Sequence, residues 1–187
     1  MKKFANWFLR ISSGWVALFC LVVFLLFVSL VLPDQAEKAD RYSPGSGSPD
    51  TSFFYTASEL YGFADSYGPL GRAAYVRARL TFDVIWPLVY TAFLITAISW
   101  LTQQTLQSSH GMGKMNLVPL AAMLFDFLEN AAAAIVMARY PDPTPILAQL
   151  AGWFTAVKWI LLSASFILLL LIIGFVYWEK RQKNKTV

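Results

Sequence analysis

The sequence contains very little cysteine, histidine or charge. Among its 187 residues there is one cysteine, Cys20, and one histidine, His110. A single cysteine allows no intramolecular disulfide and no cysteine-based metal or redox site. Together the two counts exclude a zinc site built from His and Cys, and they also exclude bis-histidine haem. We interpret Cys20, which lies in an apolar run, as a small hydrophobic residue, and His110 as part of a flexible cytoplasmic loop.

The shortage of charge indicates a membrane protein. Charged residues make up 14% of the chain and hydrophobic residues 57%, whereas a soluble domain carries about 25% charged residues. Such a chain has too few charges to cover a water-exposed surface, so lipid is expected to cover much of it. The length fits one domain, and we predict a single membrane domain over residues 1–187.

Four stretches have the roughly 20 apolar residues that a spanning helix needs. They cover residues 11–33, 80–101, 116–138 and 148–178. The first follows a basic segment, as in a signal peptide, but it is too long and lacks a small-residue cleavage site. We interpret it as a retained anchor. The predicted fold is therefore all-α: a polytopic four-helix membrane bundle with an amphipathic external helix between spans one and two.

Basic residues near the ends of the spans predict the orientation. Eight would lie on the side of the two termini and six on the side of loop 34–79, where seven acidic residues also lie. The eight are Lys2, Lys3, Arg10, Lys114, Lys180, Arg181, Lys183 and Lys185. Both termini are thus expected in the cytoplasm, with the chain in a plasma membrane or bacterial inner membrane.

The external loop, residues 34–79, is predicted to open as a polar linker that includes the Pro/Gly/Ser-rich residues 44–49. An amphipathic helix of roughly 15 residues then follows by its apolar spacing, with Asp50 or Thr51 as its N-cap. Its polar face is acidic, which favours a cap over the bundle rather than a helix on the membrane surface. Gly68-Pro69 is expected to break it, with Pro69 starting the helix that leads into span two.

Four ionisable residues fall within the spans: Asp83, Asp126, Glu129 and Lys158. Ionisable groups in a bilayer are costly and usually face a bundle interior or a cavity. Taking about 1.5 Å per residue, Tyr90, Glu129, Asn130 and Lys158 lie at one level, roughly 12–14 Å below the outer boundary. Asp126, Glu129 and Asn130 share a helix face by their i+3 and i+4 spacing. The sequence therefore predicts one polar cluster in the outer half of the membrane.

Two further features of span two bear on this cluster. Arg72, Arg79 and Asp83 share one stripe of the helix that leads into the span. Pro87 cannot donate to the carbonyl of Asp83, four residues earlier, so that oxygen is available to a water, a cation or a side chain.

Each group also has a purely structural interpretation. Glu129 with Lys158 would be a buried ion pair that fixes helix register, and Asp83 with Arg79 a surface pair worth under about 1 kcal/mol. Asp126 shows no obvious basic partner at its depth, which makes it the best candidate for a proton-carrying group.

Three functions remain open from the sequence. The first is an outward-facing site that binds or processes a lipid or other small apolar molecule, the second a proton- or ion-coupled transport or channel subunit, and the third a non-catalytic scaffold or partner subunit with a structural ion pair. The candidate acid/base residues are Glu129, Asp126 and Asp83; the candidate binding residues are Lys158, Asn130, Tyr90, Arg72 and Arg79.

Carboxylates beside a carbonyl suit Mg²⁺ or Ca²⁺ better than zinc, although the sequence identifies no cofactor. The expected partners are the bilayer and a second copy or another protein; nothing indicates nucleic acid.

Overall fold

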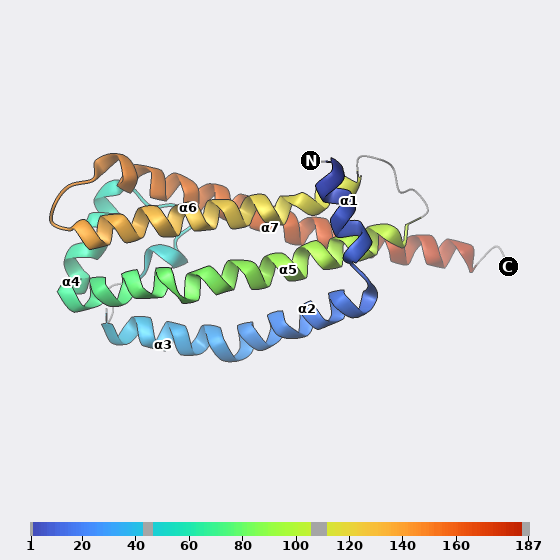
Figure 1. Cartoon of the computed structure of the whole chain (residues 1–187), viewed down its shortest axis with the longest axis horizontal. Helices are drawn as coiled ribbons and strands as arrows, with labels where there is room; N and C mark the ends of the chain where they lie inside the picture. Colours follow the sequence, from blue (N-terminus) through green and yellow to red (C-terminus); the bar gives the residue numbers. More distant parts are fainter. Residues whose placement is uncertain (1, 43–46, 106–111, 185–187) are drawn as a thin grey trace. The chain divides into compact units, whose positions relative to one another are not determined.

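The structure is a computed structural model that describes residues 2–42, 47–105 and 112–184. Within these ranges all regular secondary structure is helical (Figure 1). The elements are α1 (Lys2–Ile11), α2 (Gly14–Leu26), a π-helical turn η1 (Phe27–Val31), α3 (Leu32–Tyr42), η2 (Pro49–Thr51), α4 (Ala57–Leu80), α5 (Phe82–Gln103), η3 (Met112–Leu117), α6 (Val118–Arg139) and α7 (Pro145–Lys183). Part of the predicted linker, residues 44–46, and the loop residue His110 lie outside the described residues.

Four helical stretches are long and apolar enough to cross a membrane. They are Gly14–Arg41, Ala57–Gln103, Lys114–Arg139 and Pro145–Lys183. Each contains one of the four spans expected from the sequence, apart from residues 11–13 of the first. That difference arises because the chain leaves the helical conformation at Ser12 and Ser13, so the preceding basic segment forms a separate helix, α1.

The contacts within the chain define two compact units. Unit 1 comprises residues 1–25, 89–121 and 161–187, and unit 2 comprises residues 26–88 and 122–160. Helices α5, α6 and α7 each contribute residues to both units. The expectation of a single domain therefore stays a prediction, and each unit is described by itself below.

In unit 1, α1 is held to its neighbours through its backbone carbonyls. The side-chain amide of Gln103 donates to the carbonyls of Leu9 at 2.7 Å and Ser12 at 3.0 Å, so α1 crosses the end of α5 (Figure 1). The Asn116 amide donates to the Ala5 carbonyl at 3.2 Å. The acceptors lie in the first half of α1 (Ala5), near its end (Leu9) and just after it (Ser12), so these bonds hold the helix at more than one point along its length.

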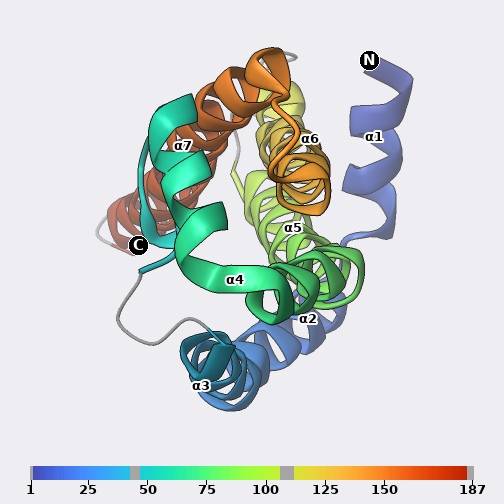
Figure 2. The same ribbon diagram turned by 90° about the vertical axis from the view of Figure 1, so that its left-hand side faces the viewer.

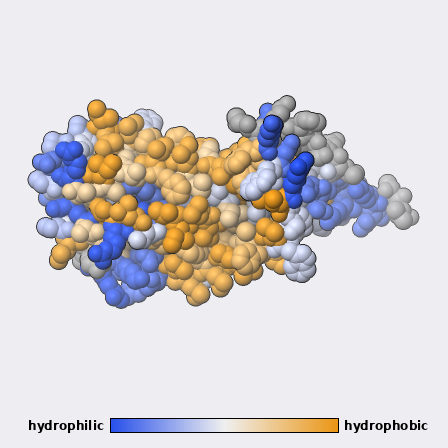
Figure 3. Space-filling model, in the orientation of Figure 1, coloured by the Kyte–Doolittle hydropathy of each residue, from blue (hydrophilic) through white to orange (hydrophobic). Residues whose placement is uncertain are grey.

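In unit 2, the first polar residues of loop 34–79 are helical, which corrects the prediction of a polar linker there. Helix α3 runs to Tyr42. Asp34 pairs with Lys38 at 2.7 Å and Glu37 with Arg41 at 2.5 Å, both four residues apart. An acid placed four residues before a base stabilises a helix, and these pairs extend the apolar helix into polar sequence. Figure 3 shows the resulting hydrophilic surface over α3.

Helix α4 begins later than predicted, with Thr56 rather than Asp50 or Thr51 as its N-cap. The Thr56 hydroxyl accepts from the Glu59 amide at 3.2 Å, and the Glu59 carboxylate accepts from the Thr56 amide at 2.7 Å. This reciprocal capping box satisfies backbone donors that an uncapped helix would leave exposed. The predicted break at Gly68 is present: Gly68 has φ 61° and ψ 179°, a conformation that glycine adopts without steric cost, and Figure 2 shows the resulting bend.

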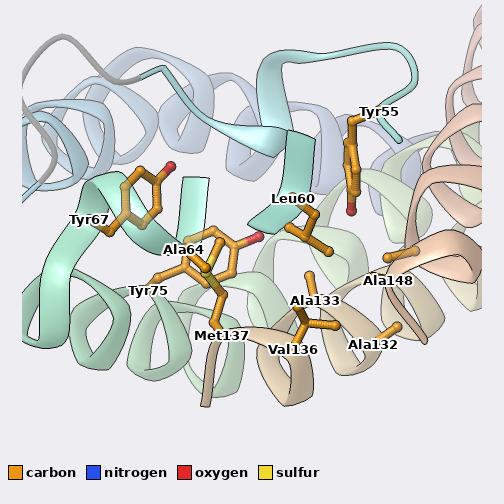
Figure 4. Packing of buried hydrophobic residues seen from close by; sticks show 11 residues of the cluster. Tyr55, Leu60, Ala64, Tyr67, Tyr75, Ala132, Ala133, Val136, Met137 and Ala148 are labelled. Atoms are coloured by element: carbon orange, nitrogen blue, oxygen red, sulfur yellow. The ribbon is translucent and has the colours of Figure 1, made fainter. Parts of the chain in front are cut away.

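The part of α4 before the bend at Gly68 packs on the second half of α6 and the start of α7. Figure 4 shows Leu60 and Ala64 facing Ala133, Val136 and Met137. The small residues of α6 allow this close approach. Polar contacts join the same elements outside this apolar core. The Tyr61 hydroxyl accepts from the Thr144 amide at 2.6 Å. Tyr140 donates to Asp65 at 2.8 Å, and this hydrogen bond raises the pKa of Tyr140. These contacts hold the start of α4 against α6 and α7, while its predicted role as a cap over the bundle stays a prediction.

The capping box predicts a pH-dependent start of α4. Hydrogen bonding to Thr56, mainly to its backbone amide, lowers the pKa of Glu59 below its ordinary 4.5. A group with a depressed folded-state pKa contributes stability that is complete above the unfolded-state value and is lost as the pH falls through the folded-state value. Hydrogen-exchange protection of the first turn of α4 should therefore fall as the pH drops below about 4.5. In Glu59→Gln the protection should be lower at neutral pH and nearly independent of pH. An unchanged acid dependence in that variant would exclude Glu59 as its source.

Candidate functional site

Three polar residues of α6 face the interior of unit 2. Asp126, Glu129 and Asn130 have exposures of 7%, 1% and 5%, and their i+3 and i+4 spacing places them on one stripe of the helix. The stripe that carries these polar residues is therefore buried, as are the small residues of α6 that pack on α4. This burial requires partners for the carboxylates, because an unpaired buried charge is strongly destabilising.

Lys158 of α7 supplies the opposite charge. Its ammonium nitrogen lies 2.5 Å from Glu129 Oε2 and 3.9 Å from Asp126 Oδ1. The sequence left Asp126 without an evident basic partner, and the structure corrects this by placing Lys158 between the two carboxylates. Trp159 lies beside the ammonium group, with its ring centre 5.3 Å away.

Arg79 and Asp83 form a second ion pair at the junction of α4 and α5. Arg79 Nη1 donates to Asp83 Oδ2 at 2.8 Å, and the side chains are only 5% and 14% exposed. The expectation of a surface pair is therefore wrong. The guanidinium carbon lies 4.1 Å from the ring centre of Tyr75, and Arg79 Nη1 also donates to Asn130 Oδ1 at 3.1 Å. A neighbouring carboxylate, an amide and an aromatic face together compensate the burial of Arg79.

Asn130 joins the two ion pairs into one network. Besides accepting from Arg79, it donates through Nδ2 to Asp126 Oδ1 at 3.0 Å and to the backbone carbonyl of Asp83 at 3.2 Å. This carbonyl is the one that Pro87 leaves without a helical donor. The sequence predicted that a water, a cation or a side chain would use it, and the partner is the Asn130 amide.

A tyrosine from the segment before α4 completes the network. Tyr55 is 1% exposed, and its hydroxyl donates to Glu129 Oε1 at 3.4 Å. The backbone of this segment lies against α7: a Cβ atom built on Gly152 would stand 1.9 Å from the Tyr55 carbonyl oxygen. Only a residue without a side chain allows that approach. We call the seven connected residues the polar cluster: Tyr55, Arg79, Asp83, Asp126, Glu129, Asn130 and Lys158.

The acidic and basic side chains of the polar cluster do not balance. It contains two basic and three acidic side chains, which gives −1 when all are ionised. Coulombic interactions are several times stronger in a protein interior than in water, so the excess carboxylate charge lies where electrostatic interactions are strong. No reaction follows from the charge alone. Within the described residues, no three His, Cys, Asp or Glu side chains are grouped to hold a metal ion.

A recess adjoins the polar cluster within unit 2. It has a volume of about 320 Å³ and is lined by Arg79, Leu80, Val84, Phe127, Asn130, Ala131 and Ala134. Five of these residues are apolar, and the two polar ones belong to the polar cluster. Ligand sites in proteins are typically about 300–1,000 Å³ in volume, mostly apolar, with a few placed polar groups. The recess has this composition and lies at the lower end of that size range.

Two of the predicted site residues have other surroundings. Arg72 donates to the Ala64 carbonyl at 2.8 Å and lies over the ring of Tyr140, 4.8 Å from its centre. These partners lie outside the polar cluster. Tyr90 is buried, at 1% exposure, but belongs to unit 1, so its predicted place at the level of Glu129 stays a prediction.

Sequence reasoning missed Tyr55 and Gly152. Tyr55 lies in the stretch that was expected to form the start of the amphipathic helix, but α4 begins only at Ala57, so helical spacing does not predict where its side chain points. Gly152 stands in an apolar helix, where a glycine weakens the helix unless packing requires it. A glycine inside this helix therefore indicated a close packing contact at position 152, but the sequence does not indicate which segment makes that contact.

No protein-family model matches this chain, and neither a curated protein nor a solved structure gives a significant match.

Proposed function

We propose that this chain is an integral membrane protein that binds a lipid, or another small apolar molecule with a polar end, in the recess beside Arg79 and Asn130. The chain would cross the bilayer four times, with both termini in the cytoplasm and loop 34–79 outside. The single observation that carries the ligand proposal is the recess, whose apolar walls end at two members of a buried polar cluster.

Length, composition and charge support the membrane assignment. Four helical stretches are long and apolar enough to span. Unit 1, which contains both termini, has eight basic residues and one acidic residue; unit 2, which contains loop 34–79, has seven basic and ten acidic residues. Basic residues in short flanking segments are retained on the cytoplasmic side. This distribution supports the proposed orientation.

The walls and the polar end of the recess support an amphipathic ligand. Leu80 and Val84 on one side are 69% and 41% exposed, and Phe127 and Ala131 lie on α6. An acyl chain or similar apolar group fits such a wall. At the polar end, the guanidinium of Arg79 provides several N–H donors, and the amide oxygen of Asn130 can accept a second hydrogen bond. These groups recognise a hydroxyl, carbonyl or phosphate oxygen.

The contacts also favour a second candidate, a scaffold in which the polar cluster has only a structural role. Lys158 contacts two carboxylates, and Arg79 contacts one. Such a network fixes how helices pack even without a ligand. The transport alternative has less support, because the buried charged residues of the described chain (Arg79, Asp126, Glu129 and Lys158) all belong to unit 2.

Filling the recess tests the ligand proposal. Ala131 lines the recess and is exposed, so Ala131→Phe should occupy the space without disturbing the interior. Native mass spectrometry of the full-length protein, extracted from membranes in mild detergent, should detect a retained lipid or small amphipathic molecule. We expect Ala131→Phe to reduce its occupancy about tenfold, as a loss of roughly 1.4 kcal/mol would.

The matched control is Ala138→Phe, an equal enlargement of an exposed residue on the same helix outside the recess lining. It should retain the parent occupancy. No bound molecule in the parent protein, or equal loss in both variants, would remove the ligand proposal. The structural candidate would then remain.

A further inference from the structure

Helix α1 of unit 1 presents three distinct faces. Ala5 and Ser12 are buried, at 1% and 3% exposure. On the opposite side, Phe4, Trp7 and Ile11 are exposed by 51%, 52% and 42% and form one stripe by their i+3 and i+4 spacing. The exposed Lys3 and Arg10 lie seven residues apart, beside that stripe. The helix is therefore amphipathic in an unusual way, since its apolar stripe faces away from unit 1.

The attachment of α1 keeps this stripe exposed. Asn116 and Gln103 hold the carbonyls of Ala5, Leu9 and Ser12 on the buried side. The stripe itself is built from stacked aromatics, with Phe4 and Trp7 ring centres 6.3 Å apart. A helix held in this way cannot turn its aromatic residues inward.

The charged residues of α1 and of the neighbouring η3 are all basic. η3 packs against α1 and carries the exposed Lys114. Neither residues 1–33 nor residues 89–121 contain any Asp or Glu. The side chains of Lys3, Arg10 and Lys114 therefore have no acidic partner in the neighbouring sequence of unit 1, and they provide a positive patch beside the aromatic stripe. Figure 3 shows hydrophilic and hydrophobic atoms next to each other over α1.

We propose that α1 and Lys114 form a binding surface for the headgroups of anionic lipids. Helices that lie in a membrane interface combine Lys and Arg with Trp, Phe and Leu on another face, and Trp side chains favour the headgroup level. Helix α2, the first apolar stretch, begins at Gly14 and is separated from the end of α1 by only two residues. This short connection holds α1 at the membrane surface in the proposed topology. There the stripe of Phe4, Trp7 and Ile11 enters the acyl boundary, and the bases contact lipid phosphates.

Native mass spectrometry of the full-length protein in detergent, titrated with phosphatidylglycerol or phosphatidylcholine, tests this surface. The titration is done in the Ala131→Phe background, where binding at the recess is expected to be about tenfold weaker, so that failure of this proposal can be distinguished from failure of the recess proposal. The parent should bind phosphatidylglycerol more tightly than phosphatidylcholine. A Lys3→Gln/Arg10→Gln/Lys114→Gln variant should lose that preference at least fivefold, since each base near an anionic surface contributes on the order of fivefold in affinity. These three side chains are exposed, so the variant should keep the parent melting temperature.

The matched control removes the same charge elsewhere in unit 1. Lys180→Gln/Arg181→Gln/Lys183→Gln neutralises three bases at the end of α7 and should keep the preference. Trp7→Ala should weaken the binding of both lipids, because it removes the apolar part of the surface. Equal loss in the two triple variants would show that net charge, and not α1, attracts the lipid. That result, or a parent without preference, would overturn the proposal.

Discussion

Replacing Lys158 by methionine is expected to destabilise the protein by about 3–5 kcal/mol, the usual effect of removing one partner of a buried ion pair. Lys158 is 7% exposed and contacts both Glu129 and Asp126. Its loss changes the formal charge of the polar cluster from −1 to −2 with no gain in solvation. Thermal unfolding of the purified protein in detergent measures the effect.

The double variant Glu129→Gln/Lys158→Met should recover most of that loss, because it returns the polar cluster to −1. The control is Lys38→Met, which breaks an exposed pair with Asp34 and should change stability by under about 1 kcal/mol. If Lys158→Met instead unfolds at or above the parent temperature, the pair does not lock the helices. The charges would then be retained at a stability cost, as binding sites often are.

Gly152→Ala is the second substitution with a large expected effect. The added methyl carbon would lie 1.9 Å from the Tyr55 carbonyl oxygen, so the segment before α4 or helix α7 must move. Overpacking of this kind costs about 1–3 kcal/mol, and more where backbone is displaced. Thermal unfolding should show this loss. Limited proteolysis in the segment before α4 should become faster.

Gly174→Ala is a control on the same helix. No atom lies within 4 Å of its added Cβ, so the change should stabilise the helix by about 0.5–1 kcal/mol. Tyr55→Phe separates the backbone contact from the hydroxyl and should cost only about 1 kcal/mol. If Gly152→Ala behaved like Gly174→Ala, Tyr55 would not be packed against α7.

The parts of the fold that sequence predicted well are those set by composition and local spacing. Long apolar runs identified the four stretches, and Gly68-Pro69 marked the bend in α4 because a positive φ favours glycine. The common face of Asp126, Glu129 and Asn130 followed from helix geometry. Their partner in α7 was inferred from depth, which needs only the rise per residue.

The parts that sequence did not predict depend on contacts between distant residues. Arg79 was assigned to the surface because its neighbour in sequence, Asp83, is a sufficient partner there; its burial depends on Asn130, 51 residues away. The approach of Tyr55 to Gly152 has no local signature. The separate helix α1 was missed because the first span was taken to run without interruption from Ile11, although Ser12, Ser13 and Gly14 at the break are residues typical of a turn.

The ion pair between α6 and α7 has a consequence for how the protein is made. In the proposed topology α6 carries both Asp126 and Glu129, while their basic partner follows 29 residues after Glu129 in the chain. At about 5–20 residues per second, Glu129 leaves the ribosome roughly 1.5–6 s before Lys158. An Asp at the centre of a spanning helix alone costs about 2.5–3.5 kcal/mol to insert. Because insertion of α6 alone is unfavourable, we expect α6 to remain at the insertion machinery until α7 has been made. The two helices would then enter the lipid together.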